Sequence, residues 1–326
     1  MSPLTGFPHG VSSFGIPVLG GGGRTLGLWG TTYFVDNDSG DDGNTGKTPT
    51  SAFLNLKAAL DVAIEGDTIY IRPKKADADN HYIRPAAALN WTIASTARGL
   101  SIIGASNGSQ ISSLGGRYMV YLRGHASVTT GEVIKVDANN VTLENLAFHP
   151  GALAAVTSSL SPTSAGVRIG AHAAGQTNST IYNCYFKLFT SPAVMATDSW
   201  YTEVNKCLFD RCRWGFSAHG SDSSLVSQRV VDCMFIGPAA NISTSVIIYS
   251  DSANDRDNIV QGCIFMHPVP SQGGYNNYVY IKSGAGLITD CRAADANMQA
   301  TTDYVIPAGV LMTQNYDDSD AEWGTT

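Results

Sequence analysis

The chain has 326 residues, of which 43% are hydrophobic and only 14% are charged, and its net charge at pH 7 is −7. This length suits one long domain, and the acidic balance gives no reason to expect nucleic acid or an anionic membrane as a partner. No apolar run approaches the roughly 20 residues of a membrane span, and the N-terminus lacks the pattern of a secretory signal, so we expect no export by a signal peptide.

Residues 1–30 form a leader whose composition differs from the rest. Pro3, Pro8 and Pro17 separate short apolar pieces, and four consecutive glycines follow at 20–23. Such a segment cannot bury a core of its own. We expect an extended leader that lies along its own body or is held by a neighbouring protein. The apolar residues expected to anchor it are Phe7, Val11, Phe14, Ile16, Val18 and Leu19.

Residues 31–75 have the pattern of a cap. A strand is expected at 33–36, a loop rich in Asp, Gly and Asn at 37–49, and a helix at 53–64 with Leu56 and Leu60 at helical spacing. A turn then leads into a strand at 65–71. A repeat protein must cover the exposed end of its first repeat, and an amphipathic helix does this.

A short phrase recurs through residues 76–300, which we expect to form the body of the domain. It has an aliphatic residue first, a turn-forming residue third in most copies, cysteine fourth and usually phenylalanine sixth. Five of the six cysteines lie in it, at spacings of 23, 26, 30 and 28 residues. The copies are 143–148 (with Leu146 in place of cysteine), 181–186, 204–209, 230–235, 260–265 and the degraded 288–293.

This phrase predicts a strand, a one-residue bend and a second strand. Its composition is typical of strands, and the fourth and sixth residues alternate at period two. Stacked copies would pair as parallel strands, so we predict an all-β fold, a single-stranded right-handed parallel β-helix, followed by a C-terminal tail segment at 301–326. The cysteines then fill one interior column as free thiols, and disulfides or a metal site are the alternatives.

Segments 33–36, 52–60 and 66–71 resemble the N-terminal cap of the pectin-lyase-like β-helix superfamily, which includes polysaccharide lyases, glycosidases and bacteriophage tailspikes. The leader, at 6–8 and 10–17, resembles the starts of bacteriophage structural proteins with β-helix bodies, and 306–310 share this character. The resemblance implies a β-helix over about residues 33–295 and a virion protein. It says little about activity, because one scaffold carries many functions.

The resemblance also implies where an enzyme of this superfamily would work: on the outer surface, with grouped carboxylates or a bound Ca²⁺. Asp232 and Asp290 occupy the bend position, which turn geometry explains. The best remaining carboxylate group is Asp198, Glu203 and Asp210. We predict no catalytic residues, and these three are the candidates if that prediction is wrong.

Oxygen ligands for Ca²⁺ are grouped in the loop of the cap. They are Asp36, Asp38, Asp41 and Asp42. The loop lacks the glutamate and the spacing of an EF-hand, and Asp, Gly and Asn are also the residues of tight turns. We therefore favour a turn cluster and predict no metal and no cofactor.

The residue after the cysteine should point outward. In chain order this stripe is Ala147, Tyr185, Leu208, Met234, Ile264 and Arg292. Its four sizeable apolar residues would make a larger patch than a soluble monomer usually exposes. Either loops cover it, or Tyr185, Leu208, Met234 and Ile264 form an interface. Three β-helices packed lengthwise would bury such a stripe, which predicts a homotrimer.

Taken together, these features predict a structural protein of the virion surface, made in the cytoplasm of a host cell. It would be a trimeric capsid decoration or spike, attached through its leader to the major capsid protein or a tail protein of a bacteriophage. Enzymatic activity is left open and not favoured. The alternatives are a polysaccharide-degrading tailspike, either glycosidase or lyase, and a non-catalytic spike that binds a host surface glycan. Trp200, Tyr201 and Trp214 could then stack on sugars.

Overall fold

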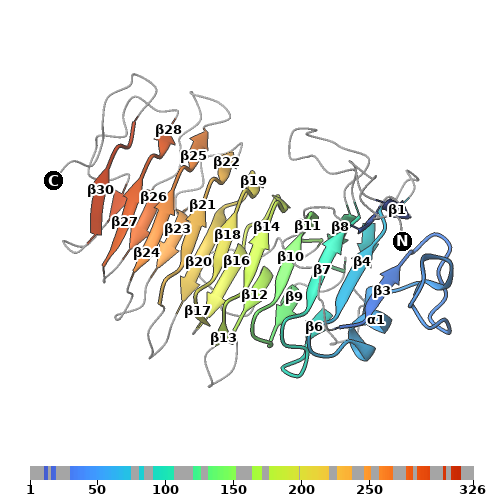
Figure 1. Ribbon diagram of the computed structural model, residues 1–326. Helices are drawn as coiled ribbons and strands as arrows, with labels where there is room; N and C mark the ends of the chain where they lie inside the picture. Colours follow the sequence, from blue (N-terminus) through green and yellow to red (C-terminus); the bar gives the residue numbers. More distant parts are fainter. Residues whose placement is uncertain are drawn as a thin grey trace.

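The computed structural model describes much of the cap and most of the repeated coils. The described residues are 11–13, 16–19, 30–74, 81–83, 91–105, 120–125, 131–151, 164–170, 176–197, 199–219, 226–236, 246–250, 257–266, 277–281, 285–293, 304–305 and 310–316. Three long parallel sheets run along one axis, from the blue N-terminal coils to the red C-terminal coils (Figure 1). The fold is the parallel β-helix that the sequence predicts.

Each coil contributes a strand to each of the three sheets in turn. Sheet I has ten strands: β3 (Thr32–Val35), β4 (Thr68–Ile71), β7 (Ser101–Gly104), β10 (Thr142–Glu144), β14 (Thr180–Tyr182), β18 (Glu203–Asn205), β21 (Arg229–Val231), β24 (Asn258–Gln261), β27 (Gly286–Thr289) and β30 (Val310–Thr313). Sheet II has eight: β5 (His81–Ile83), β8 (Val120–Arg123), β11 (Leu146–His149), β15 (Tyr185–Lys187), β19 (Leu208–Asp210), β22 (Met234–Ile236), β25 (Ile264–Met266) and β28 (Arg292–Ala293). Sheet III also has eight: β6 (Trp91–Ile93), β9 (Gly131–Val136), β12 (Ser164–Ile169), β16 (Pro192–Thr197), β20 (Trp214–His219), β23 (Val246–Ser250), β26 (Asn277–Ile281) and β29 (Tyr304–Val305).

The recurring phrase is the corner between sheets I and II. Its third residue has left-handed backbone in every copy, with φ between 50° and 63°: Asn145, Asn183, Lys206, Asp232, Gly262 and Asp290. This conformation costs glycine little free energy and is tolerated by Asn and Asp, whereas a residue such as Lys206 carries a steric cost of about 1–2 kcal/mol. One left-handed residue turns the chain sharply, so the aliphatic residue two positions before it and the cysteine directly after it both face the interior. The predicted strand, bend and strand are confirmed.

Aromatic stacking runs along the interior of sheet II. The rings of Phe148, Phe186, Phe209, Phe235 and Phe265 lie in one column with neighbouring centroids 4.6–5.4 Å apart and interplanar angles of 7–22°. All five side chains are fully buried. The spacing is close to the ~4.8 Å between paired strands, so each ring rests on the ring of the previous coil.

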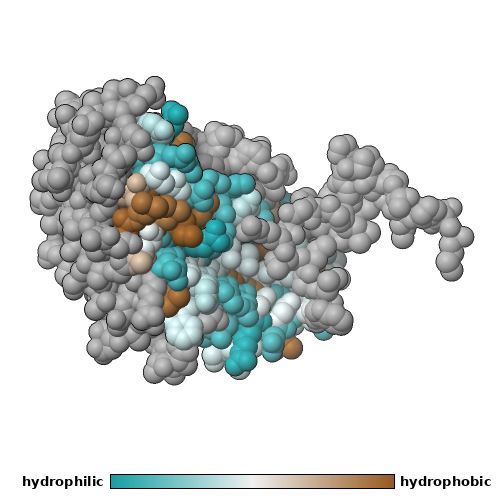
Figure 2. All heavy atoms as spheres, turned by 60° about the vertical axis from the view of Figure 1, so that its left-hand side comes forward, coloured by the Kyte–Doolittle hydropathy of each residue, from teal (hydrophilic) through white to brown (hydrophobic). Residues whose placement is uncertain are grey.

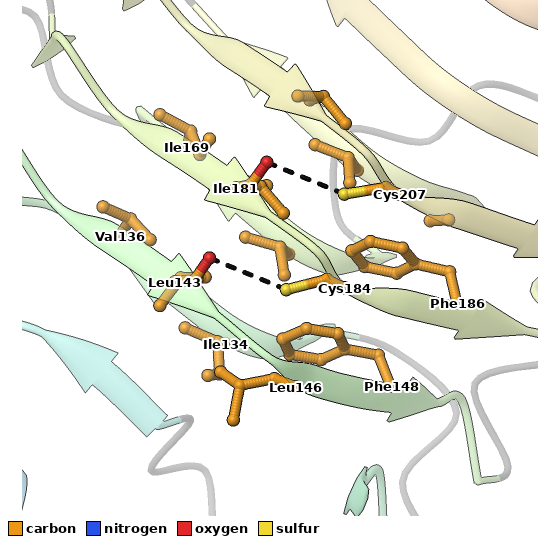
Figure 3. Close-up of a cluster of buried hydrophobic side chains, with 14 of the residues drawn as sticks. Ile134, Val136, Leu143, Leu146, Phe148, Ile169, Ile181, Cys184, Phe186 and Cys207 are labelled. Carbon is orange, nitrogen blue, oxygen red and sulfur yellow. Dashed lines mark hydrogen bonds between the residues drawn. The ribbon is translucent and has the colours of Figure 1, made fainter. Parts of the chain in front are cut away.

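The cysteines are buried free thiols, as the sequence predicts, but they also take part in hydrogen bonding. The thiol of Cys184 donates to the carbonyl oxygen of Leu143 at 3.6 Å, and that of Cys207 donates to Ile181 at 3.6 Å (Figure 3). The later thiols of the column, at 233, 263 and 291, repeat this bond to the preceding coil at 3.5–3.9 Å. Each thiol therefore serves a backbone carbonyl beside the bend, which an alkyl side chain could not do.

The column continues past the last copy of the phrase into β30. Gln314 takes the left-handed bend position, with φ of 55°, and Asn315 takes the cysteine position. The buried Asn315 donates from Nδ2 to the carbonyl of Ile288 at 3.0 Å and accepts at Oδ1 from the N–H of Cys291 at 3.1 Å. Residues 310–313 add a strand to sheet I within the segment that the sequence separates as a tail.

The cap helix is shorter than predicted. A 3₁₀ turn, η1 (Pro49–Ser51), precedes α1 (Leu56–Val62), and Phe53 forms a β-bridge with Val35 in place of a first helical turn. The bridge is favoured because Phe53 exchanges backbone hydrogen bonds with the first strand, donating to Phe34 at 2.9 Å and accepting from Asp36 at 2.8 Å. Leu56 and Leu60 are buried against the solenoid, as predicted for a cap.

The remaining described strands are short. In the leader, β1 (Val11–Ser13) and β2 (Ile16–Leu19) pair as an antiparallel hairpin, and β13 (Gln176–Thr177) pairs with β17 (Ser199–Trp200) beside the solenoid. The proposed anchor residues Phe7 and Phe14 lie outside the described residues, and only the backbone is described at Val11, Ile16, Val18 and Leu19. Their anchoring role stays a prediction. Among the described residues no helix is long and apolar enough to cross a membrane.

We predict that stability falls steeply in alkaline solution. Burial raises the pKa of Cys207, Cys233 and Cys263 well above the usual thiol value and that of Cys212 to about 12. The unfolded chain releases these protons above pH ~8.5 and the folded chain keeps them, so each thiol removes about 1.4 kcal/mol of stability per pH unit. Urea unfolding between pH 8 and pH 10 measures the slope.

The control is Cys233→Ala, which should reduce that slope by about 1.4 kcal/mol per pH unit even though it also lowers stability at pH 7. A wild-type unfolding free energy that stays constant from pH 8 to pH 10 would contradict the prediction.

Candidate functional site

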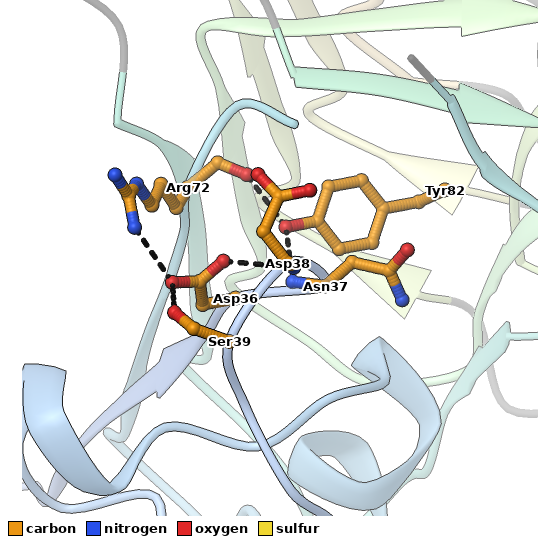
Figure 4. A network of polar contacts seen from close by, with 6 residues as sticks. All are labelled: Asp36, Asn37, Asp38, Ser39, Arg72 and Tyr82. Carbon is orange, nitrogen blue, oxygen red and sulfur yellow. Dashed lines mark hydrogen bonds and ion pairs between the residues drawn. The ribbon is translucent and has the colours of Figure 1, made fainter. Parts of the chain in front are cut away.

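A polar network joins the end of β3 to the loop of the cap that follows it (Figure 4). The carboxylate of Asp36 is buried and accepts hydrogen bonds from the hydroxyl of Ser39 and the N–H of Asp38, and it pairs with Nη1 of Arg72 at 2.8 Å. The hydroxyl of Tyr82 donates to the carbonyl of Arg72 at 2.6 Å and accepts from the N–H of Asn37 at 3.1 Å. The network thus fastens the loop to the next coil.

The electrostatics of Asp36 follow from these contacts. Burial would raise its pKa, but the hydrogen bonds from Ser39, Arg72 and Asp38 together outweigh burial, and the pKa is lowered. Burial also raises the pKa of Tyr82, so its hydroxyl stays protonated as a donor. This is the arrangement of a structural clamp, in which the carboxylate of Asp36 and the hydroxyl of Tyr82 hold the loop through hydrogen bonds.

Two of the other three carboxylates proposed for Ca²⁺ also accept hydrogen bonds from their own chain. Asp41 accepts from the N–H of Gly43 at 2.8 Å, and Asp42 accepts from both the N–H and the side-chain amide of Asn55. In the part of the chain that the structure describes, no three His, Cys, Asp or Glu side chains are grouped to hold a metal. The contacts of Asp36, Asp41 and Asp42 are those of the turn cluster that the sequence favours.

A hollow of about 240 Å³ opens beside this clamp. Its lining residues are Asn37, Asn55, Leu56, Lys57, Lys74, Tyr82, Ile83 and Trp91. Much of its polar chemistry is already used by the protein: Lys57 pairs with Asp61 one helical turn away, and the amide of Asn37 donates to the carbonyl of Leu54 at 3.1 Å. The hollow therefore marks the boundary where the cap helix packs against the first coils.

The outward stripe of sheet II is divided into a covered part and an exposed part. Ala147, Tyr185 and Leu208 form a second buried apolar cluster outside the solenoid interior. Met234 is half-buried and Ile264 is 38% exposed. The chain itself thus removes Tyr185 and Leu208 from solvent, and of the four residues considered for an interface only Met234 and Ile264 reach the surface.

The hydroxyl of Tyr185 completes this covered part. It donates to Oδ2 of Asp210 at 2.7 Å, and Asp210 also receives two hydrogen bonds from Arg211. Burial and the neighbouring Asp210 raise the pKa of Tyr185, so the phenol remains a donor at neutral pH. Asp210 is therefore an acceptor inside a buried polar cluster and is not presented to solvent.

The three carboxylates considered for catalysis do not form one described site. Glu203 lies on sheet I, where it accepts from the side-chain amide of Asn205 at 2.8 Å, whereas Asp210 lies on sheet II across the corner. Asp198 lies outside the described residues. Glu203 and Asp210 each accept hydrogen bonds from side chains of their own chain.

The aromatic residues considered for sugar stacking differ in their exposure to solvent. Trp200 is 42% exposed and the adjacent Tyr201 is 51% exposed, at a left-handed backbone position with φ of 60°. Trp214 is buried, and the guanidinium of Arg213 lies 5.8 Å from its ring centroid. Only the first two remain accessible, as one aromatic pair beside β17.

A second exposed apolar column escaped the sequence prediction. On the outer face of sheet I, strand register aligns Ile259, Leu287 and Leu311, and Leu311 is 58% exposed. The face turned toward the C-terminal end carries apolar residues gathered among hydrophilic ones (Figure 2). The recurring phrase could not predict this column. Ile259, Leu287 and Leu311 each lie one residue before its first position, where the sequence varies between coils.

Comparisons with known proteins agree with this architecture. A lacto-N-biosidase of family GH136 from Eubacterium ramulus matches with a TM-score of 0.60 at 13% identity, over 88% of this chain and 56% of the other. The pectate lyase Pel9A matches with a TM-score of 0.53 at 12% identity (89% and 81% covered), and a rhamnogalacturonan lyase with 0.50 at 13% (90% and 87%). No family model matches the sequence, and neither does any curated protein.

These likenesses define the class of protein by its fold. The chain is a parallel β-helix protein, with the fold that the pectate lyase and the rhamnogalacturonan lyase share. It spans 56% of the length of the lacto-N-biosidase that it matches. At identities of 12–13% the shared scaffold says nothing about activity, which must be argued from the surface.

We predict that Asp36→Asn destabilises the cap in a manner that depends on pH. Because the pKa of Asp36 is lowered from its ordinary value of 3.8, its stabilising effect is present above that pH and is lost as the pH falls below it. Near pH 7 the variant should lose about 1–3 kcal/mol in unfolding free energy, a difference that shrinks below pH ~3. Denaturation at both pH values tests this, with Glu65→Gln at an exposed position of the cap as the control; an equal difference at both pH values would contradict it.

Proposed function

We propose that this chain is a structural protein of a bacteriophage virion surface, a homotrimeric β-helix decoration or spike that its leader attaches to a capsid or tail protein. One observation carries the proposal: apolar side chains are exposed on the outer face of sheet II in the later coils, next to the exposed Arg292. Ile264 and Met266 are exposed on sheet II, and Met234 and Ile236 are half-buried beside them. Exposed apolar columns of this kind are typical of protein interfaces.

The hydrogen bonds of the carboxylates also favour a structural role over an enzymatic one. Asp36, Asp41, Asp42 and Asp210 each hold part of their own chain in place, so their oxygens already have donors. A hydrolase or lyase needs such groups free on a surface that a polysaccharide can reach. The attachment to a virion rests on the leader, whose sequence resembles the starts of phage structural proteins.

We predict that the purified chain is a trimer. Light scattering at micromolar concentration should give about three times the chain mass of 34.4 kDa. A chain lacking residues 1–30 should keep that mass and its circular dichroism but no longer sediment with virions that lack the protein. A monomeric mass would contradict the trimer, and retained sedimentation would contradict the anchor. Release of reducing ends or unsaturated sugars from bacterial capsular polysaccharide would replace the structural proposal by an enzymatic one.

A second candidate function is glycan binding without catalysis. The observation that favours it is the accessible aromatic pair Trp200 and Tyr201, since exposed rings can stack on sugar faces. Paired backbone holds both residues in place: β17 pairs with β13, Trp200 forms a β-bridge with Val226, and the N–H of Tyr201 donates to the carbonyl of Val226 at 2.8 Å.

If the glycan candidate is right, Trp200→Ala and Tyr201→Gly should each weaken retention on immobilised capsular polysaccharide about tenfold, as expected when one stacked ring is lost. Glycine at 201 keeps the left-handed backbone, so the loss would report the ring alone. Ile64→Ala, at an exposed position of the cap, is the matched control. Unchanged retention in both aromatic variants would exclude this pair as the binding surface.

A further inference from the structure

Basic side chains follow one another along the outer face of sheet II in its early coils. Strand register aligns Arg123 on β8 with His149 on β11, and the register of the next pair places Lys187 on β15 beside His149. The residue before each of the three belongs to the buried core, so these three side chains point outward, and all are half-buried. We call Arg123, His149 and Lys187 the basic row.

The fold does not require a basic residue at this position of the coil. The same register begins at Ile83 before the basic row and continues after it into Asp210, Ile236 and Met266. The chain as a whole has a net charge of −7. The basic row is therefore a local property of this surface in an otherwise acidic protein.

The charge of Lys187 is not used within the described chain. Its neighbour on β19 is Asp210, but that carboxylate already accepts from the hydroxyl of Tyr185 and from two nitrogens of Arg211. Among the residues that the structure describes, Lys187 forms no ion pair. Its ammonium group can therefore bind an anionic ligand.

The other two members of the basic row are also hydrogen-bond donors. Nδ1 of His149 accepts from the N–H of Gly151 at 3.2 Å, which places the proton of the neutral imidazole on Nε2. The guanidinium of Arg123 has five N–H donors, so it can bind a carboxylate in addition to the contacts that it makes within the chain. Three successive coils thus carry donors in one line.

The spacing of the basic row indicates the shape of its ligand. Neighbouring coils are about 4.8 Å apart, so the row favours a linear polyanion that lies along the solenoid axis with a charge on each unit. In an extended peptide, side chains on one side recur about every 6.7 Å, which does not match the coils. A hexose unit is close in length to the distance between coils, and a uronic acid carries one carboxylate per unit.

Apolar side chains beside the basic row fit the same ligand. Ile83, which pairs with Arg123, is 44% exposed, and Leu188, which follows Lys187, is 38% exposed. Leu188 also has left-handed backbone, with φ of 60°, which is unfavourable for a side chain of this kind. The faces of sugar rings carry C–H groups that pack on apolar side chains, whereas an inorganic anion would gain nothing from them.

We propose that the basic row of sheet II binds an acidic polysaccharide lengthwise, with the carboxylates of successive sugars on Lys187, His149 and Arg123. This surface does not include the aromatic pair Trp200 and Tyr201. The inference goes beyond the proposed function, because it depends neither on a trimer nor on attachment to a virion.

The test measures binding of the purified chain, at low salt, to alginate oligosaccharides, which carry one carboxylate per sugar. Lys187→Gln and Arg123→Gln should each weaken binding about tenfold, as expected when one contact to a charged group is lost. Lys187→Arg keeps the charge and should keep binding. The matched control is Lys47→Gln, which makes the same change in net charge at an exposed position of the cap and should bind like the wild type.

Neutral dextran and polyglutamate, an acidic peptide, complete the comparison, and equal binding of either would overturn the choice of ligand. Binding at the wild-type level by both row variants would overturn the site, as would an equal loss in Lys47→Gln. A trimeric wild type that binds no alginate would overturn this inference and leave the proposed function intact, whereas a monomer that binds through the basic row would do the reverse. Circular dichroism checks that each variant is folded.

Discussion

The left-handed residue between sheets I and II is the constraint on which the rest of the structure depends. A single residue with φ near 55° turns the chain from sheet I into sheet II, and side chains alternate within the strand on each side of it. The aliphatic residue before it and the thiol and phenylalanine after it therefore face one interior. A two-residue turn would shift one of these strands by a position and move its apolar set to the outer face. The stacked rings and the thiol bonds to the preceding coil are both consequences of that geometry.

Where the phrase is regular, the sequence could predict the structure closely. Cys184, Cys207 and their successors identify the interior, and the bend at Asn183 or Asp232 follows from residue types that tolerate left-handed backbone. The cap helix was predicted too long, because Phe53 has helical spacing in the sequence but prefers the edge of the first strand. Helical periodicity in the sequence cannot show that Phe53 will pair with the unpaired edge of a strand.

The candidate surface was harder to predict, since it depends on register across loops of unequal length. Tyr185 and Ile264 hold equivalent positions in the phrase, yet one is buried and the other exposed. Leu311 belongs to a coil whose cysteine position holds Asn315, so the phrase cannot be recognised there. Alternation says which side chains point outward, but only packing in three dimensions says which of them remain in contact with water.

The bonding of the thiol column also bears on how such a chain can change length. Each coil presents the same carbonyl to the next and receives the same side chain from it, so neighbouring coils are joined by equivalent contacts. Removing or duplicating one complete coil would leave every remaining junction chemically unchanged, whereas a partial insertion at the corner would break the alternation. Asn315 differs in kind, because its amide bonds both a carbonyl and an N–H of the coil before it. The whole coil is thus the unit in which evolution, or a designer, can extend or shorten this protein, and new coils belong upstream of that asparagine.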